Sequence, residues 1–214
     1  MQKNNFQFIS YLSIFREFIK NIQQIGAIAP DSDAVVAEFC DSIPLAPAKV
    51  IVEYGPGTGT VSRGIIGRKH AEATLICFEK NPALFKLLKN SLKGKNVFLV
   101  NEDAFDSPNV LAKQFNLSFN SVDCFISTLP NTFLNYDLLI AEKICPYLKR
   151  NGLFVTYQYI TAKVKSRNLS PVLGEHFQKV KKKHVVWNLP PATVYTCRNK
   201  RKDSSNFKIS SILR

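Results

Sequence analysis

The fold of this protein is decided by a short stretch of sequence, Val50-Ile51-Val52-Glu53-Tyr54-Gly55-Pro56-Gly57-Thr58-Gly59-Thr60. Its first three residues are apolar and β-branched, which predicts a strand buried on both faces. The three glycines that follow let the backbone turn sharply and approach a ligand closely. A helical pattern begins directly behind them, with free N–H groups in its first turn. The stretch therefore predicts a strand, a ligand-binding turn and a helix, and the alternative is a glycine-rich turn that binds nothing.

Strands and helices alternate on the carboxyl side of this stretch. Short β-rich runs predict five strands, at residues 49–54, 74–79, 97–101, 122–127 and 153–159. Helical patterns lie between them, at residues 61–67, 82–92, 110–115 and 136–148. This repetition predicts a Rossmann-like α/β fold, with a mostly parallel central sheet and helices on both faces. Two further strands, at 185–188 and 193–197, are separated by Pro190 and Pro191 and predict an antiparallel pair at the sheet edge.

The residues before the first strand predict helices. Apolar residues recur at helical spacing from Phe8 to Ile22, which is the pattern of an amphipathic helix. Asp31 or Ser32 can cap a second helix. We expect residues 1–48 to form helices that cover the ligand site, and residues 49–214 to form the Rossmann-like part of the same structural domain.

The composition is that of one folded domain. The chain has 214 residues, of which 45% are hydrophobic and 21% charged, enough for one well-buried core. Five cysteines lie far apart without a CxxC pair, which indicates reduced core residues, and no cluster has metal-ligand spacing, so we expect no metal. Neither a signal peptide nor an apolar run of roughly 18 residues is present, which predicts a cytoplasmic protein.

The charge of the chain indicates a polyanionic partner. The formal net charge is +13 and the sequence pI is about 9.6. Much of the excess lies late in the chain, at Lys179, Lys181, Lys182, Lys183, Arg198, Lys200, Arg201 and Lys202. Nucleic acid and anionic lipid headgroups both fit such a charge, and a solvated charged face is the third alternative.

Two acidic residues follow neighbouring predicted strands. Glu79 ends the second strand, where a carboxylate can accept hydrogen bonds from both hydroxyls of a ribose. Asp103 follows the third strand, where an acceptor would meet an adenine amino group. Either residue taken alone also fits a surface charge. Together with the glycine turn, they favour a site for an adenosyl group.

The glycine spacing distinguishes between classes of nucleotide-binding protein. A dinucleotide site uses GxGxxG and a P-loop continues with GKS or GKT, whereas this turn has Gly55-x-Gly57-x-Gly59 preceded by Glu53. The arrangement resembles class I methyltransferases, which use S-adenosylmethionine. The resemblance implies that Glu53 lies near the methionine moiety. It also implies a set of cofactor-binding residues: Ile28, Pro30, Glu53, Gly55, Gly57, Thr58, Gly59, Glu79, Lys80, Asp103, Ala104 and Ser127.

Three further motifs narrow the resemblance to the bacterial phospholipid N-methyltransferases. They are the segment from Gln24 to Ser32, Ser127-Thr128-Leu129-Pro130 and Asn188-Leu189-Pro190-Pro191-Ala192, so the likeness extends from about residue 15 to about residue 195. Membership would imply an aminophospholipid acceptor such as phosphatidylethanolamine. It would also imply work at an anionic membrane surface, with the protein peripheral to the inner face of the membrane.

The ribosomal RNA adenine dimethyltransferases are the nearest rival family. They carry Asn-Leu-Pro-Tyr or Asn-Leu-Pro-Phe after the fourth strand, where this chain has Thr128-Leu129-Pro130-Asn131. The asparagine that would accept from adenine N6 and the stacking aromatic are both replaced, which weakens a base-flipping hypothesis. An RNA or protein N-methyltransferase remains the alternative, followed by a non-catalytic protein that binds S-adenosylmethionine.

The acceptor site is predicted at the fifth strand. Tyr157 and Tyr159 share one face by two-residue alternation. We expect Tyr159 to orient the amine and its ring to tolerate the growing cation, whereas ordinary sheet packing is the alternative. Ser127 and Pro130 complete the predicted catalytic set by shaping the acceptor pocket.

Overall fold

The computed structural model describes residues 33–43, 45–129, 135–160, 168–186 and 191–201. The chain forms two compact units, Met1–Pro30 and Asp31–Arg214, and all the described residues belong to the second. The predicted amphipathic helix at 8–22 lies outside the described residues. Three predicted site residues do so as well: Ile28, Pro30 and Pro130.

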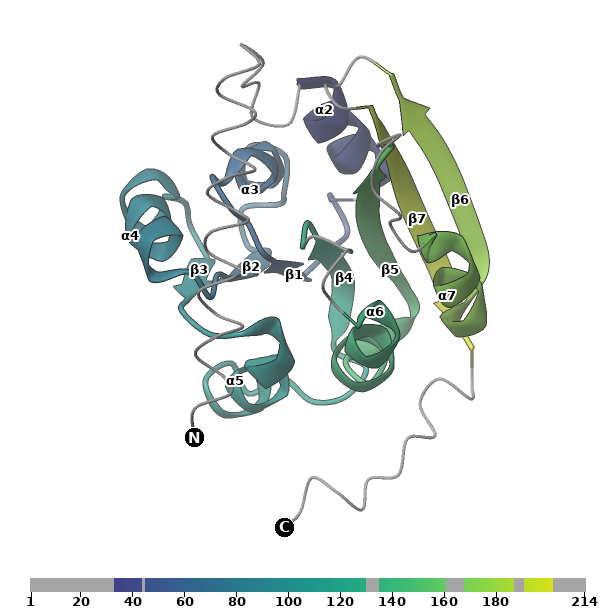
Figure 1. Cartoon of the computed structure of the whole chain (residues 1–214). Helices are drawn as coiled ribbons and strands as arrows, with labels where there is room; N and C mark the ends of the chain where they lie inside the picture. Colours follow the sequence, from purple (N-terminus) through teal and green to yellow (C-terminus); the bar gives the residue numbers. More distant parts are fainter. Residues whose placement is uncertain (1–32, 44, 130–134, 161–167, 187–190, 202–214) are drawn as a thin grey trace, which may run out of the picture. The chain divides into compact units, whose positions relative to one another are not determined.

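A seven-stranded sheet with the order β3-β2-β1-β4-β5-β7-β6 forms the centre of the second unit (Figure 1). The strands are β1 (Val50–Tyr54), β2 (Thr74–Phe78), β3 (Val97–Val100), β4 (Val122–Ser127), β5 (Leu148–Tyr159), β6 (Phe177–Val185) and β7 (Ala192–Lys200). Strands β1 to β5 pair in parallel, while β7 runs antiparallel to both of its neighbours, β5 and β6. The Rossmann-like fold and the antiparallel pair at the edge are therefore confirmed.

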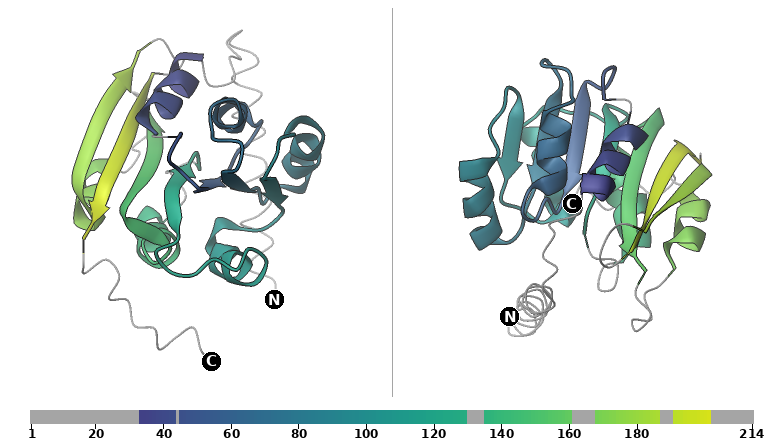
Figure 2. Two further views of the ribbon diagram at one scale, coloured as in Figure 1. Left: turned by 180° about the vertical axis from the view of Figure 1, so that it is seen from behind. Right: turned by 90° about the horizontal axis from the view of Figure 1, so that it is seen from above.

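Helices cover both faces of the sheet (Figure 2). They are α2 (Asp33–Ser42), α3 (Thr60–Ile66), α4 (Pro82–Ser91), α5 (Ser107–Lys113), α6 (Tyr136–Leu138) and α7 (Leu169–His176). A 3-10 turn, η1 (Ala104–Asp106), precedes α5, and a π-helical segment, η2 (Leu139–Ile144), continues α6. Side chains of α2 and α3 bury one face of the sheet, and those of α5, α6, η2 and α7 bury the other.

The hydrophobic core has two parts because the central strands carry apolar side chains on both faces of the sheet. Ile51 and Ile126 belong to the cluster under α2 and α3, and Phe125 and Phe154 belong to the cluster on the opposite face. All five cysteines are buried and have free thiols, which confirms that they are core residues. None of the described helices combines the length and the apolar composition that a membrane span requires.

Strand β6 is much longer than the sequence indicated. We predicted a strand at 185–188, but β6 begins at Phe177 and ends at Val185. Four of its nine residues are lysines, which conceal the alternation of a strand. Lysine is a residue that protects the open edge of a sheet from pairing with another chain. The lysine run is thus part of the sheet, at its outermost strand.

Candidate functional site

The carboxyl ends of the parallel strands form one row at the edge of the sheet. Tyr54 of β1 pairs with Phe78 of β2 and with Ser127 of β4, and Phe78 pairs with Val100 of β3. The residues that come next in each strand therefore lie side by side at this edge. They are Gly55, Glu79, Asn101 and Thr128.

The glycine turn has a backbone that side chains would disturb. Gly55, Gly57 and Gly59 have φ angles of +73°, +60° and +81°. A Cβ atom on Gly55 would lie 2.5 Å from Leu129 Cδ2, so any other residue here would displace the Leu129 side chain. A Cβ on Gly57 would meet no described atom closer than 3.9 Å. The turn therefore packs against β4 at Gly55 and is open at Gly57.

Glu79 lies against this open part of the turn. Its Oε2 accepts a hydrogen bond from the Gly57 N–H at 3.1 Å, and its Oε1 accepts one from the Asn81 N–H at 2.8 Å. Only 6% of the residue is exposed, and burial raises the pKa of its carboxyl. The structure thus brings the predicted ribose ligand and the glycine turn together.

Lys80 follows Glu79 at the end of β2, and Asp103 follows the end of β3. Lys80 Nζ is 2.6 Å from Asp103 Oδ2, and Asp103 Oδ1 accepts from the Phe105 N–H at 3.0 Å. Asn101, which we did not predict, donates from Nδ2 to the Glu79 carbonyl at 2.7 Å and so joins the two strand ends. Asp103 therefore contacts the residue that follows Glu79, and the neighbouring Ala104 is buried in the core.

Glu53 lies beneath the turn and is fully buried. Its Oε2 accepts a hydrogen bond from Ser62 Oγ at 2.6 Å and one from Cys77 Sγ at 3.4 Å. Its Oε1 has no hydrogen-bond partner among the described residues. Burial raises the pKa of this carboxyl to about 7. The strand that leads into the glycine turn thus carries a buried carboxylate oxygen without a hydrogen-bond partner among the described residues.

A group of buried hydroxyls holds the end of β4. Ser127 Oγ is 2.9 Å from the Tyr136 hydroxyl, which donates to the Leu129 carbonyl at 2.9 Å and lies 3.2 Å from Thr156 Oγ1. Ser127 is fully buried, so its hydroxyl contacts this group and is not exposed on the surface. We did not predict a role for Tyr136, because its hydrogen-bond partners come from two other elements.

The hydroxyls of Thr128 and Thr58 form hydrogen bonds with other residues of the site. Thr128 Oγ1 donates to the Gly55 carbonyl at 2.5 Å, which ties the end of β4 to the glycine turn. Thr58 Oγ1 is 3.2 Å from Thr60 Oγ1 at the start of α3. The hydroxyl of Thr128 therefore has a structural partner within the protein.

Tyr157 and Tyr159 form an aromatic pair at the end of β5. Their ring centroids are 4.9 Å apart in a T-shaped arrangement, and the Tyr157 hydroxyl donates to the Tyr159 hydroxyl at 3.0 Å. Tyr157 also packs against Phe39 of α2, with centroids 5.6 Å apart. The predicted shared face is confirmed, and it is the face that α2 covers.

A cavity of about 200 Å³ lies elsewhere. Its lining includes Asp123, Lys149 and Arg198. Asp123 lies near the start of β4 and Lys149 near the start of β5, so the cavity is at the amino ends of these strands. The glycine turn is at the opposite edge. This cavity is therefore separate from the candidate site.

Solved methyltransferases share this fold. A precorrin-6y C5,15-methyltransferase from Geobacter metallireducens GS-15 matches with a TM-score of 0.59 and 17% identity, over 76% of this chain and 86% of that chain. A 1,6-didemethyltoxoflavin-N1-methyltransferase from Burkholderia thailandensis, with bound 1,6-didemethyltoxoflavin and S-adenosylhomocysteine, matches with a TM-score of 0.60 and 15% identity over 90% of both chains. The fold, together with the curated relative described next, identifies the chain as a class I methyltransferase dependent on S-adenosylmethionine.

A curated relative resembles the chain over nearly its whole length. It is an ornithine lipid N-methyltransferase from Singulisphaera acidiphila, 26% identical in an alignment of 190 residues that covers 85% of this chain and 92% of the relative. No family model matches the sequence. The chain is thus similar in sequence to a lipid N-methyltransferase, as the motifs predicted.

Proposed function

We propose that this methyltransferase transfers a methyl group to the amine of a membrane lipid, at the inner face of the membrane. The similarity to the ornithine lipid N-methyltransferase carries the proposal, because it covers 85% of this chain and 92% of that relative. Phosphatidylethanolamine and ornithine-type lipids both present a primary amine beside an anionic group. The acceptor class is therefore an aminolipid.

The described residues fit S-adenosylmethionine in three places. Glu79 lies at the open glycine turn, where its carboxylate can accept from the ribose hydroxyls. Asp103 is the adenine-side acceptor, and the unpartnered Oε1 of Glu53 is the acceptor on the methionine side. When bound, the cofactor supplies a methyl group on a sulfonium, which is already electrophilic. The task of the protein is then to position the acceptor and exclude water.

Tyr159 is our proposed orienting residue for the amine. The hydrogen bond from Tyr157 and the T-shaped packing fix the direction of its ring. An aromatic face attracts the positive charge that builds up on the nitrogen as its C–N bond forms. The amine must first lose a proton, to a protein acceptor or to water. Ser127 and Pro130 are assigned to the shape of the acceptor pocket, Ser127 acting through its contact with Tyr136.

The contacts of Thr128 support a lipid acceptor over an RNA adenine. Recognition of a flipped adenine needs a group that accepts from N6 and a stacking ring. Thr128 replaces the amide that would accept from N6, and its short side chain is held against the glycine turn by the hydrogen bond to the Gly55 carbonyl at 2.5 Å. Asn131 replaces the stacking ring. Both replacements remove contacts with a base and leave a lipid amine unaffected.

Methyl transfer from labelled cofactor separates the acceptor classes. The protein is incubated in parallel with vesicles that contain phosphatidylethanolamine or an ornithine lipid, with ribosomal RNA and with protein extract. We expect label only in lipid, and the Tyr159→Leu variant, which lacks the aromatic face, should transfer more slowly while it binds the cofactor normally. Label confined to RNA or protein would refute the lipid acceptor, and tight cofactor binding without any transfer would indicate a non-catalytic protein.

A further inference from the structure

Strands β5 and β6 end, and β7 begins, at the corner of the sheet next to the proposed acceptor site. Tyr159 of β5 pairs with Ala192 of β7, which pairs with Val185 of β6. The residues that follow Tyr159 and Val185 are Ile160 and Val186, whose exposed fractions are 51% and 63%. Two large aliphatic side chains are thus exposed at the tip of this corner, about two strand spacings apart, or roughly 10 Å.

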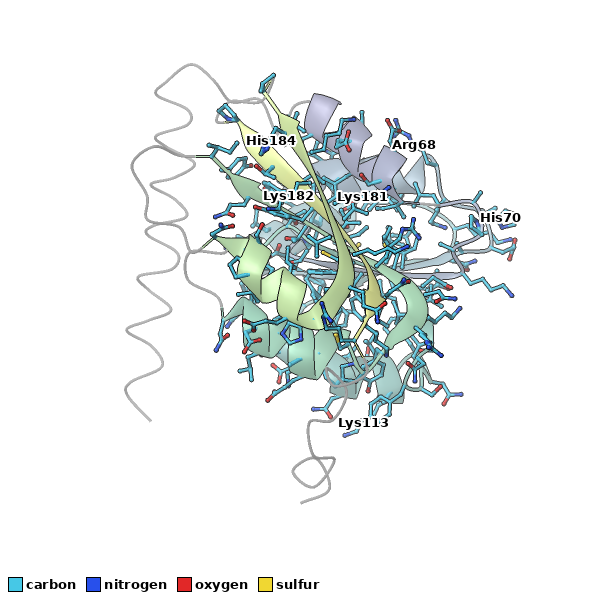
Figure 3. The ribbon with its side chains drawn as sticks, turned by 90° about the vertical axis from the view of Figure 1, so that its right-hand side faces the viewer. Arg68, His70, Lys113, Lys181, Lys182 and His184 are labelled. Atoms are coloured by element: carbon cyan, nitrogen blue, oxygen red, sulfur yellow. The ribbon has the colours of Figure 1, made fainter. Side chains whose placement is uncertain are left out.

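Cations line the strand that leads to this tip. Lys181 and Lys182 extend to opposite sides of β6, with His184 further toward its end (Figure 3). Lys183 pairs with Glu38 of α2. Lys181 and Lys182, in contrast, form no ion pair with any described residue, and both are exposed. The edge therefore presents unneutralised positive charge beside exposed aliphatic groups.

Protection of the sheet edge accounts for only part of this arrangement. Lysines on an outer strand prevent pairing with another chain. Exposed aliphatic side chains at the strand ends have the opposite effect, because they favour association. A surface that combines lysines with exposed aliphatic side chains is complementary to an anionic bilayer. The headgroups attract the lysines, and the acyl boundary accepts the aliphatic side chains.

We propose that Ile160, Lys181, Lys182, His184 and Val186, here called the β6 corner, dock the protein on an anionic lipid bilayer. The inference rests on the proposed lipid acceptor, since docking here would bring Tyr159, at the same corner, to the level of the headgroups. RNA is the other polyanion, but single-stranded RNA is bound by stacking on exposed rings. Phe177 and Tyr195, the phenylalanine and tyrosine of β6 and β7, are both buried.

Vesicle flotation with matched variants tests the docking surface. Each lysine near an anionic surface contributes about fivefold to the partition coefficient, so Lys181→Gln with Lys182→Gln should lower binding to phosphatidylglycerol vesicles about 25-fold at low salt. Arg68→Gln with Lys113→Gln removes the same charge from other exposed positions (Figure 3) and should change binding much less. Raising the salt concentration should weaken wild-type binding.

A second variant and its matched control test the contribution of the exposed aliphatic side chains to vesicle binding. Ile160→Ser should weaken vesicle binding, whereas Leu87→Ser, at a residue that is also 51% exposed, should not. Equal losses in the corner and control variants would overturn the proposal, because net charge or general stickiness would then explain the binding. The same losses toward RNA as toward vesicles would also overturn it, in favour of a nucleic-acid surface.

A soluble acceptor separates docking from catalysis. With a short-chain aminolipid dissolved below its critical micelle concentration, the corner variants should methylate at the wild-type rate, because no bilayer has to be reached. Loss of transfer to this soluble lipid would overturn a pure docking role. If wild-type protein methylates no aminolipid but still binds vesicles through the corner, the docking surface stands and the proposed acceptor fails.

Discussion

Replacing Glu53 by Gln should flatten the pH dependence of stability. The buried carboxyl has a pKa of about 7 in the folded protein, against an ordinary value of 4.5, because burial penalises its charged form. Below pH 4.5 the group is neutral in both the folded and the unfolded chain. As the pH rises, the unfolded chain loses this proton first, so the free energy of unfolding falls until the folded carboxyl also ionises near pH 7. At about 1.4 kcal/mol per pH unit, this loss amounts to about 3 kcal/mol.

Urea unfolding followed by circular dichroism, from pH 4.5 to pH 8, measures this effect. The wild-type free energy of unfolding minus that of the Glu53→Gln variant should fall by about 3 kcal/mol across this range. Glu72→Gln is the control, because Glu72 is 66% exposed and pairs with Lys95, which lowers the pKa of its carboxyl. Its difference should stay nearly constant above pH 4.5. A constant or rising difference for Glu53→Gln would refute the buried, proton-binding carboxyl.

Three further changes test the site. Glu79→Ala should weaken binding of S-adenosylmethionine by about 1–3 kcal/mol, since a carboxylate that accepts hydrogen bonds is lost, and unchanged affinity in calorimetry would contradict its ribose role. Gly55→Ala should destabilise the fold by about 1–3 kcal/mol in urea, because φ is +73° and the new Cβ would meet Leu129 at 2.5 Å; an unaltered midpoint would show that the turn relaxes freely. Tyr136→Phe should cost about 1–3 kcal/mol, since Ser127 loses its hydroxyl partner, and equal stability would mean that water replaces it.

The strands and the glycine turn could be predicted because their signals are local. Apolar runs mark β1, β2, β3 and β4, and the structure places each within one or two residues of its predicted range. Helix α7 was missed, because Pro171 and Gly174 within eight residues obscure its periodicity. Strand β6 was missed over most of its length, since its four lysines conceal the alternation of a strand.

In the candidate site, too, some features are visible in the sequence and others arise only in the folded structure. Glycines that need positive φ and carboxylates that follow strands are visible in any linear sequence, so the class of the protein and the candidates Glu53, Glu79 and Asp103 came from the sequence by itself. Only the tertiary structure decided that Ser127 contacts Tyr136, that Asn101 joins two strand ends, and that lysines and exposed aliphatic residues share one corner. Those facts depend on strand register and burial, which arise when distant segments pack together and have no signature in any single segment.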